Sequence, residues 1–303
     1  MNHERGCGPV FHGAAAKGSE QLLDPAMIWQ TTRFEIDLSV PRVMGIVNVT
    51  PDSFSDGGAH SNVAAAIAHC ERLLADGADL LDIGAESTRP GARPVGPDEE
   101  LARLMPVLDA ALKLGCPVSV DTRHAPVMRA VLGRGADIVN DIQALRDPGA
   151  LGLVVAHPNC GVCLMHMRGT PESMQSQPAY VDVVAEVIAF LQERVEQLRV
   201  RGVAMQRVVL DPGVGFGKSV EHNLALLSRQ RELLALGQPL LLGWSRKSTL
   251  GAITGRDVAQ RGAASLAAML ATVQLGARIV RVHDVAATVD ALKVWRAAGL
   301  VPG

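Results

Sequence analysis

Eight polar residues of the sequence stand at, or a few residues beyond, the ends of short apolar runs. They are Asn48, Asp82, Asp121, Asn140, His166, Asp211, Ser245 and Arg281. Carboxylates and amides can hydrogen-bond the polar edge of a flat ligand, and an arginine can bind phosphate oxygens through two N–H groups. Loops are polar in general, which explains a few such residues but not eight in succession. The pattern predicts one polar site assembled from the ends of several strands.

The elements that must position these residues alternate along the chain. Short apolar runs typical of buried strands occupy residues 43–48, 79–83, 117–121, 137–140, 161–166, 207–211, 239–243 and 278–282. Longer amphipathic stretches typical of helices occupy residues 61–76, 97–114, 124–134, 147–156, 180–201, 221–235, 257–275 and 285–298. Continuous apolar strands joined by crossover helices indicate a parallel sheet buried on both faces. Eight such units predict an α/β fold, a single (β/α)8 TIM barrel, whose active site lies at the carboxyl-terminal ends of the strands.

Length and composition are compatible with this barrel but do not select it. The chain has 303 residues, of which 48% are hydrophobic, so two smaller domains or a doubly wound open sheet would also fit. The eightfold alternation favours the barrel, which we assign to residues 36–303. Residues 1–35 are assigned to an N-terminal extension that we expect to be mobile, because residues 1–25 are rich in Gly, Ala and polar residues and show no stable period.

Composition excludes several function classes. The formal net charge of −2 shows no basic surplus for nucleic acid, so local cations would have to meet a phosphate-bearing ligand. Aromatic residues make up only 3% of the chain, which argues against a platform for stacking bases. The N-terminus has no signal-peptide pattern, and polar residues interrupt the most apolar stretch, 263–277. The number of cysteines, five, is odd, which favours reduced thiols. A cytoplasmic protein is therefore expected, without nucleic-acid or membrane partners.

Two motifs suggest chemistry that their spacing does not support. Residues 213–219, GVGFGKS, fail the phosphate-loop pattern because Pro212 stands where the first glycine is needed. We expect these glycines instead to let a loop backbone approach a flat ligand closely. His157, Cys160, Cys163 and His166 are spaced like zinc ligands. Cys163 and His166 would point to opposite faces of one buried strand, however, so Cys163 is predicted to be a small core residue.

The motifs at the predicted strand ends resemble those of the dihydropteroate synthase family of bacterial folate biosynthesis. The motifs are MGIVNVTPDSFSDGG at 44–58, DIGAESTRPGA at 82–92, SVDT at 119–122, VND at 139–141, LMHMRGTPESMQ at 164–175, LDPGVGFGKS at 210–219, SRKS at 245–248 and RVHDV at 281–285. They appear in the family's order over about residues 40–298. The resemblance implies an enzyme that condenses a hydroxymethyl-dihydropterin pyrophosphate with p-aminobenzoate, giving dihydropteroate and pyrophosphate.

The resemblance implies a pterin pocket formed by Asp121, Asn140, Met165, Asp211 and Lys247. Asp211 can accept two hydrogen bonds from the ring's amino and amide N–H groups, and Asn140 can both donate and accept. Met165 would form an apolar wall against the ring. Asp121 would stabilise positive charge on the pterin if pyrophosphate departs before the amine attacks.

The resemblance also implies a pyrophosphate site formed by Asn48, Arg89, Arg281 and His283, with Asp121, Lys247, Arg281 and His283 as the catalytic set. Mg²⁺ would bridge the pyrophosphate, and the side-chain oxygen of Asn48 is the one evident protein ligand. A shell made mainly of water and phosphate oxygens suits this ion.

The implied aminobenzoate site comprises Phe54, Thr88, Pro90, Phe216, Lys247 and Ser248. Ser248 is predicted to start the helix after the seventh strand, where free N–H groups favour a carboxylate. Sulfonamides mimic aminobenzoate and are expected to compete there. The loops after the first two strands are expected to order over the substrates. The family implies a homodimer through the apolar region 257–275, although burial within one subunit would explain that composition equally well.

Two further functions remain open from the residues alone. A methyltetrahydrofolate-dependent methyltransferase also binds pterin in a barrel, but it would not need SRKS at 245–248 or the STRPG loop at 87–91 for its substrates. A non-catalytic pterin-binding paralogue would be expected to lack Arg281, Lys247 or the first two loop motifs, and none of these is missing. Release of pyrophosphate that depends on p-aminobenzoate separates all three.

Overall fold

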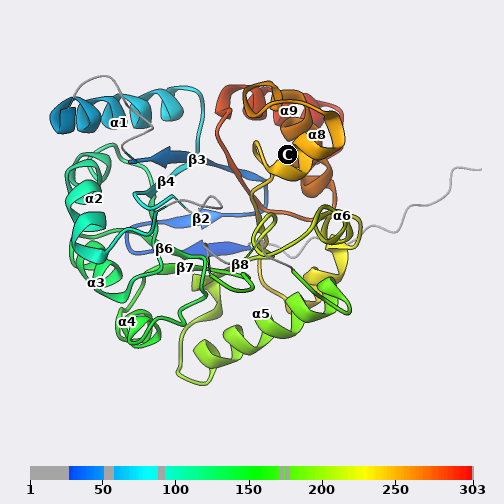
Figure 1. Cartoon of the computed structure of the whole chain (residues 1–303). Coiled ribbons are helices and arrows are strands. Elements are labelled where there is room, and N and C mark those ends of the chain that lie inside the picture. Colours follow the sequence, from blue (N-terminus) through cyan, green and yellow to red (C-terminus); the bar gives the residue numbers. More distant parts are fainter. Residues whose placement is uncertain (1–26, 51–57, 88–92, 171–173, 175–177, 302–303) are drawn as a thin grey trace, which may run out of the picture.

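Eight parallel strands form the centre of the computed structural model, which describes residues 27–50, 58–87, 93–170, 174 and 178–301 (Figure 1). The strands are β3 (Arg42–Asn48), β4 (Leu80–Gly84), β5 (Val118–Asp121), β6 (Ile138–Asp141), β7 (Gly161–Met165), β8 (Val208–Asp211), β9 (Leu241–Leu242) and β10 (Ile279–Val282). Their spatial order is β8-β7-β6-β5-β4-β3-β10-β9, and a parallel bridge from Leu210 to Leu240 joins the two outer strands. The predicted barrel is confirmed, and neither an open sheet nor two separate domains is present in the described chain.

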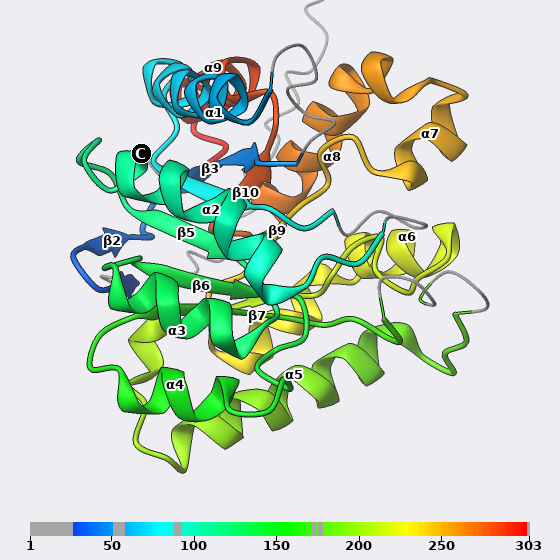
Figure 2. The same cartoon turned by 60° about the vertical axis from the view of Figure 1, so that its left-hand side comes forward.

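Helices surround this barrel (Figures 1 and 2). They are α1 (Gly58–Ala75), α2 (Pro97–Ala111), α3 (Ala125–Gly133), α4 (Ala150–Ala156), α5 (Val183–Arg199), α6 (Val220–Ser228), α7 (Ser248–Thr254), α8 (Gly262–Gln274) and α9 (Val285–Ala297), with 3-10 segments η2 (Met205–Arg207), η3 (Gln230–Leu236) and η4 (Val258–Gln260). The single helix predicted at 257–275 is wrong at its start. The range is divided into the 3-10 segment η4 and the helix α8. Helix α7 ends before this range, at Gly255, whose backbone is left-handed with φ 67°. Within the described residues, no helix is long and apolar enough to cross a membrane.

Side chains alternate along each strand between the surrounding helices and the barrel interior, and this alternation decides where the polar residues at the strand ends point. On β4, Leu81 and Ile83 pack with the surrounding helices, whereas Leu80 packs inside the barrel. Asp82 is two residues beyond Leu80 and therefore points into the same interior, one level closer to the carboxyl end. Cys163 of β7 lies in the interior layer, as predicted for a small core residue. The four cysteines that the structure describes are buried and free.

A hairpin that the sequence analysis did not predict packs against the amino-terminal end of the barrel. Strands β1 (Ile28–Gln30) and β2 (Glu35–Asp37) pair antiparallel, and the 35/36 boundary drawn from the sequence falls within this hairpin. Trp29 is fully buried with the interior residues of the barrel, and its Nε1 donates to the carbonyl oxygen of Arg207 at 3.0 Å. The strands are only three residues long, which is too short for a periodic signal.

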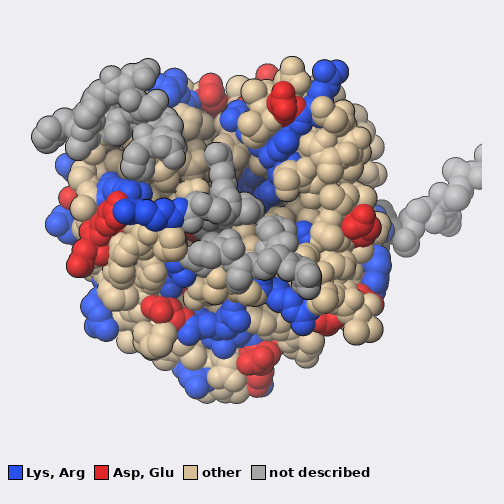
Figure 3. Space-filling model, viewed as in Figure 1, with Lys and Arg blue, Asp and Glu red and all other residues tan. Residues whose placement is uncertain are grey.

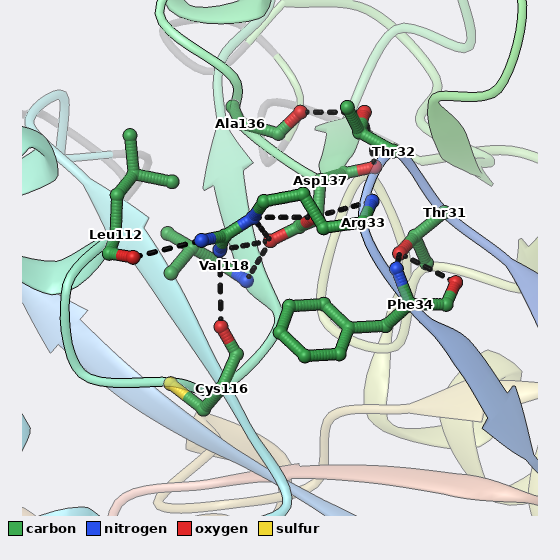
Figure 4. A network of polar contacts seen from close by, with 9 residues as sticks. All are labelled: Thr31, Thr32, Arg33, Phe34, Leu112, Cys116, Val118, Ala136 and Asp137. Carbon is green, nitrogen blue, oxygen red and sulfur yellow. Dashed lines mark hydrogen bonds and ion pairs between the residues drawn. The ribbon is translucent and has the colours of Figure 1, made fainter.

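The turn of this hairpin is attached to the barrel by Arg33 and Asp137 (Figure 4). The guanidinium of Arg33 donates to both oxygens of Asp137, at 2.6–3.2 Å, and to the carbonyl oxygens of Leu112 and Cys116. Asp137 is completely buried and also accepts from the backbone N–H groups of Arg33 and Val118. The two residues therefore link the hairpin to the helix α2 end and to two strands.

Replacing Arg33 with alanine should destabilise the fold. The change leaves the buried Asp137 carboxylate with backbone donors alone, and breaking a buried pair typically costs 3–5 kcal/mol. Because the Arg33 side chain is 32% exposed, we expect a smaller loss of roughly 2 kcal/mol in the free energy of unfolding, measured with urea. Arg199→Ala, which breaks an exposed pair with Glu196 on α5, should leave the urea midpoint unchanged. Equal midpoints for the two variants would contradict the assigned role of the network.

Candidate functional site

The carboxyl-terminal ends of the strands bring five polar side chains together. Asp82, Asp121, Asn140, Asp211 and Arg281 come from β4, β5, β6, β8 and β10. Arg281 Nε donates to Asp82 Oδ2 at 2.6 Å, and Arg281 Nη2 donates to Asp121 Oδ2 at 2.8 Å. Asn140 Nδ2 donates to the same Asp82 oxygen at 3.1 Å. The predicted rim site exists, and an arginine between two carboxylates occupies one side of it.

Burial and charge oppose each other within this group. Burial alone would lower the pKa of Arg281. The negative charges of Asp82 and Asp121 raise that pKa by more than burial lowers it, so the guanidinium stays charged. Burial raises the pKa of Asp121 to about 7, although Arg281 partly counteracts that rise. Asp82 is completely buried, and its Oδ1 has no hydrogen-bond partner among the described residues. A buried unpaired acceptor in an otherwise bonded cluster points to a donor supplied by a ligand or by water.

Asp211 and Lys247 form the opposite side of the site. The Gly213 N–H donates to Asp211 Oδ1 at 2.7 Å, which fixes the orientation of that carboxylate. Burial raises the pKa of Asp211 and lowers the pKa of Lys247 to about 8, where Asp211 opposes the shift. Lys247 Nζ lies 4.2 Å from the centre of the Phe216 ring, which is a cation–π contact. The predicted pair of a lysine and an aromatic ring is therefore in contact.

An apolar cluster lies beside these polar groups. Met165, at the end of β7, packs with Ile142, Met167 and Met174, and the partly buried Phe216 covers the cluster. In the strand order, β7 lies between β6 with Asn140 and β8 with Asp211. The predicted apolar wall is therefore in a position to face a flat ring held by those two residues. Ile142 was not predicted, because one isoleucine after a strand has no distinguishing signal in the sequence.

Ser245 holds the backbone and the ring of His283. The N–H of His283 donates to Ser245 Oγ at 3.2 Å, and that hydroxyl lies 2.9 Å from His283 Nδ1. The hydroxyl can accept from the backbone N–H and still either donate to Nδ1 or accept from it. The two contacts therefore fix the orientation of the imidazole ring at the end of β10. Asn48 ends β3 on the same rim and is half-buried.

Helix α7 begins at Ser248 as predicted, but the residue in the capping position is Lys247. Ser248 itself is exposed, and Lys247 makes no side-chain capping bond. Arg246 has a left-handed backbone with φ 59°, its N–H donates to Ser265 Oγ, and its side chain pairs with Asp284 at 2.6 Å. These contacts hold a conformation that L-residues rarely adopt, and they set the direction from which Lys247 enters the site.

The glycines of the loop after β8 let its backbone approach other parts of the protein, and their predicted approach to a ligand stays a prediction. All three have positive φ, but a Cβ on Gly213 would lie 1.9 Å from the carbonyl oxygen of His166, and one on Gly217 would lie 2.5 Å from that of Arg168. A Cβ on Gly215 would lie 3.1 Å from Lys247 Cδ. The glycines therefore let the loop approach other parts of the protein closely. Sequence spacing could not distinguish this from approach to a ligand, because both require the same backbone freedom.

Four predicted site residues, Phe54, Thr88, Arg89 and Pro90, lie outside the described residues. The expectation that the first two loops order over substrates falls on residues 51–57 and 88–92 and is likewise outside them. Asp82 was recognised as a rim residue but was given no ligand. The signal for it was present in the sequence, since a carboxylate within an apolar strand must meet a partner.

Comparison with known proteins agrees with this geometry. The family model described as "Pterin binding enzyme" matches residues 44–283. The dihydropteroate synthase of Neisseria meningitidis serogroup C is 53% identical over 277 residues, which make up 90% of this chain and 98% of that protein.

Solved structures show the same similarity. The dihydropteroate synthase of Xanthomonas albilineans, solved with 4-aminobenzoic acid, is 51% identical and has a TM-score of 0.85, with 91% of this chain and 100% of that chain covered. The Yersinia pestis enzyme, solved with a sulfonamide drug, is 44% identical and has a TM-score of 0.84, with 90% and 99% covered. Both similarities extend over nearly the whole of each chain.

Proposed function

The chain belongs to the pterin-binding enzyme family, and from this we propose that it catalyses the dihydropteroate synthase reaction. It condenses 6-hydroxymethyl-7,8-dihydropterin pyrophosphate with 4-aminobenzoate, giving 7,8-dihydropteroate and pyrophosphate. The observation that carries the proposal is one rim on which Asn140 and Asp211 come from the strands on either side of Met165, Lys247 contacts Phe216, and Arg281 binds Asp82 and Asp121. This arrangement offers hydrogen bonds to one edge of a flat ring and cations to a phosphate group. Lys and Arg side chains are visible within the hollow near the centre of one face of the molecule (Figure 3).

Asp211 and Asn140 recognise the edge of the pterin in this proposal. With Oδ1 bonded to Gly213, the Asp211 carboxylate still has free acceptor capacity for the ring's N–H groups. Asn140 uses one amide hydrogen on Asp82 and keeps the other hydrogen and its oxygen for the ligand. Met165 and Ile142 provide the apolar surface for the ring face. A ring with a matching edge leaves no buried polar group unpaired, which is the basis of selection.

The reaction is a displacement at the exocyclic methylene carbon. The bond from this carbon to a pyrophosphate oxygen breaks, and pyrophosphate leaves with the electron pair. The amine nitrogen of 4-aminobenzoate then bonds to the carbon and loses a proton. Arg281 and His283 bind the departing anion, and the negative Asp121 stabilises positive charge that develops on the pterin. The neutral aromatic amine needs no strong base, so positioning dominates.

Mg²⁺ is part of the proposal. The described residues include no group of three or more His, Cys, Asp or Glu side chains able to hold a metal, so the protein would supply few ligands. The half-buried Asn48 at the end of β3 offers a neutral oxygen, which fits an ion that keeps water and phosphate oxygens. When bound, Mg²⁺ would neutralise part of the pyrophosphate charge. Omitting Mg²⁺ should therefore stop pyrophosphate release and weaken binding of the pterin pyrophosphate.

For 4-aminobenzoate, Lys247 and Phe216 carry the proposal within the described residues. The ammonium lies over the Phe216 ring, so a carboxylate and an aromatic ring can be met by adjacent groups. Ser248 follows directly at the first position of α7. A sulfonamide has the same ring and a polar group in place of the carboxylate, so it is expected to compete with 4-aminobenzoate.

A coupled assay for pyrophosphate tests the function. The chain should release pyrophosphate from the pterin substrate only when 4-aminobenzoate is present, and sulfanilamide should inhibit competitively with it. A methyltransferase would instead consume methyltetrahydrofolate, and a non-catalytic paralogue would bind pterin without release. Folded protein that binds the pterin substrate but gives no aminobenzoate-dependent release would disprove the proposal.

A homodimer is also part of the proposal. Ile253 and Val258 are 54% and 50% exposed on α7 and η4, and Ala263 and Ala267 are exposed on the adjacent α8. Such an apolar surface is typical of a subunit contact. Sedimentation equilibrium should give twice the chain mass of 32.0 kDa, and a mass of 32.0 kDa at every concentration would contradict the dimer.

The two shifted groups predict a narrow pH optimum. Charge stabilisation requires ionised Asp121, which becomes populated as pH rises through about 7. Contact with the carboxylate of 4-aminobenzoate requires the protonated form of Lys247, and this form is lost as pH rises through about 8. We therefore expect kcat/KM for 4-aminobenzoate, at saturating pterin substrate, to increase up to about pH 7, to decrease above about pH 8 and to be highest between them.

Asp121→Asn distinguishes the two limbs of this profile. The variant should have a lower maximum and no rising limb near pH 7, while the decrease near pH 8 remains. A rising limb that persists in the variant would show that another group is responsible for it.

A further inference from the structure

Lys218, which the reaction scheme does not use, has its ammonium group inside a ring of acceptors. Its Nζ lies 2.9 Å from His166 Nδ1, 2.9 Å from the Gly213 carbonyl oxygen and 3.0 Å from that of Phe216. The residue is 2% exposed. Nζ also lies 3.3 Å from the His166 carbonyl oxygen, so acceptors of the protein surround every N–H donor of Lys218 and none is left for a substrate. Burial lowers the pKa of Lys218 to about 7, and Asp211 opposes that shift.

The acceptors converge because of the local backbone and a neutral histidine. The positive φ angles of Gly213, Gly215 and Gly217 turn the loop so that two of its carbonyl groups face one point. Burial, and then the positive charge of Lys218, lower the pKa of His166 to about 2, so its ring is neutral and Nδ1 accepts. The Phe190 ring packs edge-on against this imidazole at 5.0 Å. Without the side chain of Lys218, these acceptors would face each other with no donor between them.

The loop held in this way carries the aromatic ring of the aminobenzoate site. The Phe216 N–H donates to the Gly213 carbonyl oxygen at 3.1 Å, and the Phe216 carbonyl oxygen accepts from Lys218. The centre of the Phe216 ring lies 4.2 Å from Lys247 Nζ. A shift of this peptide would therefore move the ring and the lysine stem that packs against Gly215.

A second attachment connects the same loop to the helix after Lys247. Asn223 Oδ1 accepts from the Gly215 N–H at 2.9 Å, and Asn223 Nδ2 donates to Thr249 Oγ1 at 2.9 Å. Asn223 and Thr249 are both buried. The loop at 213–217 is thus fixed from the β7 side by Lys218 and from the α7 side by Asn223.

We propose that Lys218 is a positioning residue for 4-aminobenzoate: its ammonium fixes the 213–217 loop, and thereby holds Phe216 against Lys247. This rests on the proposed function of the site. Lys218 touches neither substrate. Its removal should weaken aminobenzoate binding more than binding of the pterin edge, because the Phe216 peptide accepts directly from Lys218, whereas Asp211 belongs to β8 and meets the loop only through the Gly213 N–H, and Asn140 belongs to β6.

The experiment uses Lys218→Ala with and without n-propylammonium, which replaces the atoms removed from the side chain. We expect KM for 4-aminobenzoate to rise at least 10-fold, KM for the pterin substrate to change no more than about twofold, and propylammonium to reverse most of the rise. Choline at the same concentration is the control, because it has the charge but no N–H donor. Asn223→Ala should raise the same KM without any response to propylammonium.

Each outcome decides the inference. Equal rises in both KM values, an unchanged aminobenzoate KM, or equal recovery with choline would overturn it. If Lys218→Ala does not fold, Lys218→Met is used, because methionine has a similar volume but no N–H donor. Its KM for 4-aminobenzoate should also rise at least 10-fold while its KM for the pterin substrate changes no more than about twofold. Wild-type protein is assayed in parallel: an inactive wild type would refute the proposed function, whereas an active wild type with an unaffected Lys218 variant refutes this inference alone.

Discussion

Replacing Arg281 with lysine should lower kcat/KM by roughly 10²–10³-fold, the usual effect of losing a principal donor to a developing anion. The guanidinium spans two carboxylates, with Nε on Asp82 and Nη2 on Asp121, and still presents N–H groups to pyrophosphate. A lysine keeps the charge, but its single ammonium cannot reproduce a planar fork that meets three anionic groups. The charge on the leaving group would then be stabilised less in the transition state than in the native enzyme.

The lysine variant is preferable to an apolar one because it leaves neither buried carboxylate without a cation. Arg278→Lys is the matched control. Arg278 directly precedes β10 at the opposite end of the barrel, where it donates to the Ser39 carbonyl oxygen, and its replacement should not change kcat/KM. Steady-state kinetics and a thermal melt of both variants give the measurement. An Arg281→Lys variant that keeps more than a tenth of the native kcat/KM would show that the fork is not required.

Replacing Asp211 with asparagine should weaken binding of the pterin substrate by about 10³-fold, which corresponds to about 4 kcal/mol. The reason lies in Gly213, whose N–H donates to Asp211 Oδ1 at 2.7 Å. In the variant this N–H keeps the amide oxygen at that position, so the amide NH₂ must face the ligand. Donors of the ring edge would then meet a donor, and two charge-assisted hydrogen bonds, worth about 1.5–3 kcal/mol each, would be lost.

Titration calorimetry with the pterin substrate measures this effect directly. The control is Asp109→Asn, which removes an exposed carboxylate paired with Arg134 on the helix surface and should leave the affinity unchanged. Affinity within 10-fold of the native value in Asp211→Asn would indicate that the ring does not donate to this side chain. The comparison does not depend on catalysis, so it separates recognition of the pterin from the displacement step.

The order of elements was accessible from the sequence because of how a parallel sheet is buried. Strands covered on both faces must be continuously apolar, so each appears as a short run between longer amphipathic stretches. The carboxyl ends of such strands share one rim, which predicted that Asp121, Asn140 and Asp211 would meet. The family motifs then gave each residue a ligand. Their assembly at one end of the barrel is confirmed, while the individual roles remain to be tested by the variants above.

Short and irregular elements were not accessible. The hairpin β1–β2 has strands of three residues, and its burial depends on the barrel end against which it packs. The division of residues 248–274 into α7, η4 and α8 depends on a left-handed conformation of Gly255, which the sequence permits but does not require. Propensity describes what a segment can do alone, and tertiary contacts choose among the possibilities.

The sequence by itself determined a barrel with polar strand ends and the residue types available there. Tertiary structure decided the partners: Arg281 with Asp82 and Asp121, Lys247 with Phe216, and Lys218 with His166. These pairs join residues 31 to 199 positions apart, so no local spacing encodes them. A side chain's direction follows from strand alternation, but its partner and its pKa follow from what the closed barrel places beside it in a buried, weakly screened interior.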